Sequence, residues 1–451
     1  MIAGSKSGGR TSLFPLALAA LLLALSVAAL AMGQFSNDDD VIGYASATPT
    51  DPVAQLQKQI DSGQVQLAFD PNHGYLPAVL KALHVPVSSQ GLVFSRTSLQ
   101  VDRISPWSPR AIYFNDDVYV GWVQNGPIME VAAVDPRLGG VFYTLDQQPT
   151  AHPKFQRQFS TCLQCHDSSS STGGVPGFIM RSVFADKMGY PISSPVAATT
   201  QQTPIAERWG GWYVTGTTGP QPHLGNLMAP VSAHDVGDPD AYLATMKIGP
   251  NLNVTSLSSR FDTEPYLSPH SDAVALMVLA DQTYIHNLIT LAGYEARKAV
   301  YDDELASATG GAGATSEGAM VRIRGAAERL VRGLLYAREA PLASPIKGDS
   351  TFAADFVKVG PHDHLGRSLR DLDLKTRLFT YPLSYLIYSD SFNALPDVVK
   401  DYVYRRLDQV LSGQDPKGDF TDLNPADRTA IREILQDTKP EFAATLTAAA
   451  K

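Results

Sequence analysis

The sequence is poor in cysteine, has no basic run, and has no long apolar stretch after its N-terminus. Two cysteines in 451 residues are too few to stabilise a fold of this size, so any role that they have is local. The chain has 36 basic and 45 acidic residues, so acidic residues are in excess. It also has no run of Lys or Arg that could displace counterions from a phosphate backbone. We therefore expect no nucleic-acid partner.

The remaining composition is that of a loop-rich globular protein. Hydrophobic residues make up 44% of the chain and charged residues 18%, which excludes disorder for most of it. The chain is too long for one compact core, so two or three packed regions are expected.

The first 31 residues have the pattern of a signal peptide. Lys6 and Arg10 form a charged start, residues 13–28 an apolar centre, and residues 29–31 (ALA) a small-x-small cleavage pattern. An uncleaved anchor is the alternative, because the apolar stretch approaches the length of a membrane span. Both interpretations predict an exported, periplasmic protein, whose only membrane contact is this segment if it is retained.

Both cysteines belong to one motif, CLQCH, at residues 162–166. The C-x-x-C-H pattern is typical of c-type haem attachment, and its chance occurrence here is on the order of 1 in 10,000. Two thiols one turn apart can add to the vinyl groups of one porphyrin, and the adjacent imidazole then reaches the iron. We predict one covalent haem c, anchored by Cys162 and Cys165, with His166 as the proximal iron ligand.

A zinc half-site, a dithiol redox pair and an ordinary disulfide are the other uses of such a motif. Zinc needs two further ligands at short spacing, and none follows. A thioredoxin-like pair opens a helix after a strand, whereas residues 167–174 are rich in Ser, Thr and Gly and predict a loop. The motif and its compartment favour haem.

The sixth iron ligand decides between electron transfer and small-molecule chemistry. His223 is the first candidate, because its Pro- and Gly-rich loop could present an imidazole rigidly; a solvated turn histidine is the alternative. His286, in a predicted helix, could face a haem or be a hydrogen-bonded core residue. The thioether candidates are Met180, Met188 and Met228, although methionines more often fill apolar gaps.

Residues 208–216 (RWGGWYVTG) combine flat aromatic rings with a guanidinium. Trp212 could line a macrocycle or be an ordinary sheet residue. Arg181 and Arg208 are the candidates for pairing with haem propionates, with a surface arginine as the alternative for each.

The chain is predicted to divide into regions after the signal peptide. We expect a linker at 32–59, a β-rich region at 60–150, a loop-rich haem-attachment region at 151–265, and a helical region at 266–451 with a flexible loop at 306–318. The predicted fold class is therefore α+β.

Local patterns add detail to these regions. Short β-branched and aromatic runs at 91–94, 111–114, 118–123 and 140–143 predict an antiparallel sheet, with a turn at 115–117 (NDD). Helices are predicted from the N-cap Ser268 toward residue 301, and over 320–338, 366–393, 395–412 and 425–437. The arginines and aspartates of 367–377 predict surface or interregional ion pairs.

Four runs make the sequence similar to a family of long exported bacterial proteins that contain a cytochrome c domain. These runs are residues 102–106, 109–124, 208–216 and 369–374. The resemblance covers nearly all of the mature chain and implies one covalent haem on Cys162, Cys165 and His166, but no established reaction. In that family a histidine often stands where this chain has Thr218, which argues against position 218 as an iron ligand.

Three functions remain open. The first is electron transfer to a redox partner protein. The second is a haem oxidoreductase or peroxidase-like enzyme with an open iron face, and the third is a redox or gas sensor. The size of the chain favours an enzyme, because one haem needs far less polypeptide. No acid–base pair is recognisable beside the motif, so no catalytic residue is assigned and electron transfer is the leading hypothesis.

Overall fold

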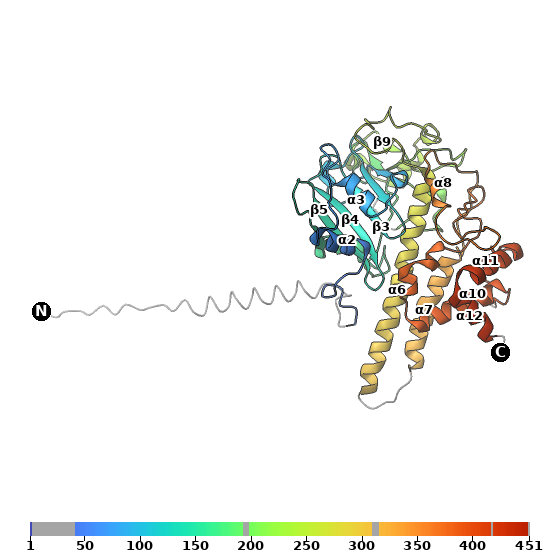
Figure 1. The fold of residues 1–451 in the computed structure, drawn as a ribbon. Coiled ribbons are helices and arrows are strands. Elements are labelled where there is room, and N and C mark those ends of the chain that lie inside the picture. The colour runs from blue at the N-terminus through green and yellow to red at the C-terminus, as the bar shows by residue number, and fades with distance from the viewer. Residues whose placement is uncertain (2–40, 193–197, 309–314, 416–417, 450–451) are drawn as a thin grey trace.

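The computed structural model describes Met1 and residues 41–192, 198–308, 315–415 and 418–449. The protein is α+β, as predicted, with an antiparallel sheet beside a helical C-terminal region (Figure 1). The predicted signal peptide and the start of the predicted linker lie outside the described residues.

Seven strands form one antiparallel sheet. Their order is β6-β5-β4-β3-β2-β1-β8, so six strands follow the chain order and β8 is added at the edge from a distant segment. The four predicted runs all fall within strands, to within one residue at their C-terminal ends. Asn115 forms the predicted turn, because its side-chain oxygen accepts the amides of Asp117 and Val118. The bounds are β1 (Gly91–Val93), β2 (Arg110–Phe114), β3 (Val118–Trp122), β4 (Ile128–Asp135), β5 (Gly139–Asp146), β6 (Phe155–Gln158) and β8 (Trp212–Tyr213).

The sheet separates two hydrophobic cores, because alternate residues of a strand point to opposite faces. Tyr113 belongs to the core that contains helices α2 (Pro52–Asp61) and α3 (Leu76–Ala82). Its neighbour Phe114 belongs to the other core, with helix α6 (Ala273–Ala308).

Residues 41–59 differ from the predicted linker. Ile42 and Tyr44 are at most 2% exposed and pack in the α2 core, and Tyr44 donates a hydrogen bond to the carbonyl of Gly140. Asp51 caps α2 and accepts a hydrogen bond from Tyr143 at 2.6 Å. From residue 41 onward the predicted linker is therefore packed structure.

The middle region is loop-rich, as predicted. Its regular elements are short: α4 (Ser160–His166), α5 (Pro239–Ala244), and the parallel pair β7 (Ala185–Asp186) and β9 (Met228–Ala229).

The C-terminal region is built on a long helical hairpin, α6 and α7 (Glu317–Leu334), which extends beyond the body of the protein (Figure 1). Helix α6 is long and apolar enough to cross a membrane, but 83% of its most apolar window is buried inside the protein. It begins at Ala273 behind the N-cap Asp272, later than predicted. The predicted loop at 306–318 is shorter, because α6 continues to Ala308 and α7 begins at Glu317.

The predicted helix at 366–393 was wrong. Aspartate side chains bind nearby backbone amides in that segment, for example Asp373 with Thr376, and these local bonds compete with a helix. Helices at 395–412 and 425–437 are confirmed within two residues. The remaining elements are α8 (Phe352–Phe356), α9 (Asp390–Asn393), α10 (Asp397–Leu411), α11 (Pro425–Thr438) and α12 (Pro440–Ala449).

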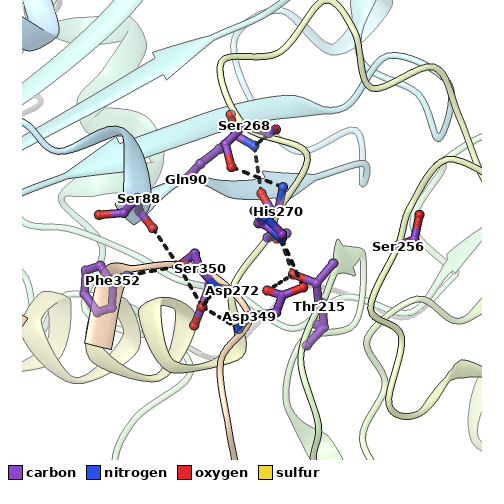
Figure 2. A network of polar contacts seen from close by, with 12 residues as sticks. Ser88, Gln90, Thr215, Ser256, Ser268, His270, Asp272, Asp349, Ser350 and Phe352 are labelled. Atoms are coloured by element: carbon purple, nitrogen blue, oxygen red, sulfur yellow. Dashed lines mark hydrogen bonds and ion pairs between the residues drawn. The ribbon is translucent and has the colours of Figure 1, made fainter. Parts of the chain in front are cut away.

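Polar clusters join the regions. Asp272 caps α6 with one carboxylate oxygen and accepts the amides of Asp349 and Ser350 with the other (Figure 2). Asp349 pairs with His270 at 3.0 Å and accepts a hydrogen bond from Thr215 at 2.7 Å. At a second junction Arg370 forms an ion pair with Asp116, which confirms the predicted interregional pairing.

Candidate cofactor site

The C-x-x-C-H motif lies on helix α4, whose last residue is His166. Its buried residue Leu163 packs in the α2 core and fixes the helix against the sheet. Cys162 and Cys165 are free thiols at i and i+3, which places them on the same helix face. Burial raises the pKa of Cys162 to about 11. A thiol with a raised pKa is a poor nucleophile for disulfide exchange, so burial makes Cys162 poorly suited to that role.

The imidazole of His166 is oriented by the backbone. Its Nδ1 lies 2.8 Å from the carbonyl oxygen of Gly177, which can only accept, so Nδ1 carries the proton. Burial lowers the pKa of His166 to about 4, so the ring is neutral. In this tautomer Nε2 holds a free lone pair, which is the state that a metal-binding histidine requires.

A cavity of about 550 Å³ adjoins the motif, within the roughly 300–1,000 Å³ range of cofactor pockets. The strand register places one set of alternating side chains in its wall, on the α6 side of the sheet. These sheet residues are Arg110, Ile112, Gly121, Glu130, Ala132, Phe142 and Thr144. Leu279 and Thr283 of α6 close the opposite side.

Five of the predicted site residues line this one cavity. They are Cys162, Cys165, His166, Arg181 and Trp212. Trp212 lies on β8, paired with Val93, and its indole donates to the carbonyl of Arg181 at 2.8 Å. Trp212 is therefore a sheet residue, and it also faces the cavity.

Two buried guanidinium nitrogens in the wall have no partner among the described residues. They are Nε of Arg110 and Nε of Arg181. Arg110 also forms an ion pair with Glu130 at 2.7 Å, and Gln100 donates to the same carboxylate at 3.0 Å. An unpaired buried donor is costly, so these two nitrogens fit a ligand that brings anionic groups. A haem propionate is such a group.

Arg208 and His223 lie elsewhere and do not line the cavity. The Arg208 guanidinium donates to the carbonyls of Thr203, Thr200 and Gln201, so it closes its own loop and is removed from the propionate candidates. His223 is 1% exposed, and its Nδ1 accepts the amide of Gly225 at 3.1 Å. Burial lowers its pKa to about 4.

Among the other ligand candidates, Met180 alone lines the cavity. The Nε2 of His286 donates to the carbonyl of Asp116 at 2.8 Å, so this ring serves the turn between β2 and β3. Met188 is exposed, and Met228 is half-buried on β9.

No protein-family model, curated protein or solved structure matches the chain. The site therefore has to be interpreted from its own residues. Within the described ranges, no cluster of three or more His, Cys, Asp or Glu could hold a metal ion by itself.

Arg110, Glu130 and Phe142 were missed as site residues. The Phe142 ring lies 4.6 Å from the His166 ring, and the other two form the charged part of the wall. A sequence signal did exist: Glu130 is a charged residue between the buried Met129 and Val131 of a strand. Its partner across the sheet could be recognised only once the register was known.

Proposed function

We propose that the chain is an exported, single-haem c-type cytochrome that transfers electrons to or from a redox partner protein. Cys162 and Cys165 would hold the haem through thioethers, and His166 would bind the iron through Nε2. Arg110 and Arg181 would pair with the propionates. When bound, the haem supplies a one-electron couple; the protein supplies attachment, orientation and exclusion of water.

The observation that carries this proposal is the geometry of His166. A neutral imidazole is fixed by Gly177 with Nε2 free, at the end of the helix that bears both thiols and beside a cavity of cofactor size. A disulfide or a dithiol pair would need none of these features.

Met180 favours electron transfer over small-molecule chemistry. Methionine is a common sixth ligand of electron carriers, and Met180 lines the same cavity as His166. The cavity wall also contains two tyrosines, and the hydroxyl of each is hydrogen-bonded to another side chain. Tyr143 donates to Asp51 at 2.6 Å, and Tyr119 accepts from Gln282 at 2.8 Å.

A haem oxidoreductase is the second candidate, because Glu130 and Arg110 bring a carboxylate and a guanidinium into the cavity. A carboxylate at that place could hold or release a proton beside an open iron face, which is the acid–base group that the sequence did not reveal.

The test is a reduced-minus-oxidised spectrum of protein exported from a host competent for thioether attachment. We expect a low-spin, six-coordinate spectrum that resists carbon monoxide, and conversion to high spin in Met180→Ala but not in His223→Ala. Prompt binding of carbon monoxide to the wild type would overturn electron transfer in favour of the oxidoreductase or a haem-based sensor. Colourless protein would refute both candidates.

A further inference from the structure

Exposed apolar side chains gather beside the cavity. Among the described residues after Met1, ten large apolar side chains are exposed. Five of them lie in two loops, at residues 96–109 and 187–190. We call these five the mouth patch: Leu99, Val101, Trp107, Met188 and Tyr190. Trp107 is 56% exposed, whereas the other three tryptophans are at most 4% exposed. Apolar gatherings of this kind mark interaction sites on soluble proteins.

Arg96 ties the two loops together. Its guanidinium donates to the carbonyl of Met188 and the hydroxyl of Tyr190, both at 3.0 Å, and lies 4.4 Å from the Tyr190 ring centre. Its amide also donates to Gly189 at 2.8 Å.

The patch borders the cavity. The neighbours of Arg96 in the chain, Ser95 and Thr97, line the cavity, as do Leu99 and Val101 of the patch itself. A partner seated on the patch would therefore lie close to whatever fills the cavity.

The charge around the patch is opposite to that of the whole protein. Arg103 and Lys187 are exposed within the two loops and Arg96 is half-buried, against the single exposed acid Asp102. The full chain carries a net charge of −9. An acidic partner would thus be repelled by most of the surface and attracted here, which orients the encounter.

We propose that the mouth patch is the electron-exchange face of the protein and that its partner is an acidic protein with an apolar centre. This inference rests on the proposed function. Trp107 is the anchor, since a large aromatic ring gains most from burial at an interface, and Arg103 with Lys187 steers the approach.

The first test needs no haem. Quenching of Trp107 fluorescence is measured on the full chain at low ionic strength, with iodide and with caesium, using Trp107→Phe to subtract the buried tryptophans. We expect the ratio of iodide to caesium quenching to be at least about twofold higher for Trp107 than for free N-acetyltryptophanamide in the same buffer, because the local charge is positive. In R103E/K187E the ratio should fall below that of the free compound.

The matched control is K58E/K81E. It changes the net charge by the same amount, but Lys58 and Lys81 are exposed on α2 and α3, on the other side of the sheet from the cavity. The raised ratio should survive in this control. A wild-type ratio at or below that of free N-acetyltryptophanamide would overturn the proposal, whether or not the protein binds haem.

The second test uses the haem-loaded chain in stopped flow. Oxidation by the trianion ferricyanide should slow about tenfold in R103E/K187E and much less in K58E/K81E, and the wild-type rate should fall with salt. Trp107→Ser should slow reduction by anthraquinol disulfonate, which is flat and anionic, severalfold while leaving the spectrum unchanged.

The two proposals fail separately. A normal haem spectrum with equal rates in both double variants overturns the electron-exchange face alone. Protein without haem refutes the proposed function, while the quenching result still decides the charge of the patch.

Discussion

Replacing Gly121 by alanine tests how the charged wall of the cavity is built. Gly121 lies on β3 between Arg110 and Glu130, and a Cβ at this position would collide with the Arg110 guanidinium. Its backbone is ordinary strand, and the three heavy atoms nearest to the added Cβ all belong to the Arg110 guanidinium. Overpacking costs about 1–3 kcal/mol. Moving the guanidinium aside would avoid that cost but break the Arg110–Glu130 pair, whose side chains are 19% and 16% exposed, which costs about 1 kcal/mol.

We therefore expect Gly121→Ala to lower the free energy of unfolding by about 1–3 kcal/mol, measured by urea denaturation. In an Arg110→Ala background the same change should be neutral or stabilise by about 0.5–1 kcal/mol, since the guanidinium is gone and alanine suits a strand better than glycine. Gly325→Ala on the exposed side of α7 is the control and should stabilise by up to about 1 kcal/mol, because nothing lies within 4 Å of its added methyl. An equal cost of Gly121→Ala in both backgrounds would refute the reasoning.

Three further predictions concern the junctions between regions. Burial lowers the pKa of His286 from 6.5 to about 4, so between these pH values the unfolded state binds more protons and the free energy of unfolding falls as the pH falls. In His286→Gln, urea melts over this pH range should show a free energy of unfolding that falls less, by up to about 3 kcal/mol. Arg370→Ala removes the ion pair with Asp116 and a guanidinium 4.1 Å from the Tyr385 ring centre, and should cost about 1–3 kcal/mol; no change would show that the pair is not formed in solution. Asp272→Ala leaves the start of α6 and the amides of 349–350 without an acceptor, and should lower the free energy of unfolding by about 2–4 kcal/mol in thermal or chemical denaturation. Asp240→Ala, on the exposed helix α5, is the control and should be nearly neutral.

The fold class and the sheet could be predicted because they depend on local patterns. The β-branched runs and the Asn115 turn act within a few residues, and Asn424 with Pro425 marks the start of α11 in the same local way. The packing of Ile42 and Tyr44 could not be predicted, because a short apolar pair in an acidic segment gains its stability only from a distant core.

The candidate site likewise has a part that depends on local sequence and a part that depends on tertiary contacts. Cys162, Cys165 and His166 are contiguous in the sequence, so the motif could be recognised without a structure. The cavity wall is assembled from strands, a loop and a helix, and Arg110 meets Glu130 only through the sheet register. His223 looked well placed because its loop is rigid, but the direction that a loop faces is a tertiary property.

Helix α6 connects the cavity to a remote part of the protein. Leu279 lies in the cavity wall, and the helix continues for 29 residues to Ala308, which is about 43 Å of rod at roughly 1.5 Å per residue. A tilt of about 5° at the wall would move the far end of such a rod by roughly 4 Å. Any such tilt of α6 would thus be magnified at its far end, and a spectroscopic label near Ala308 would report on it from outside.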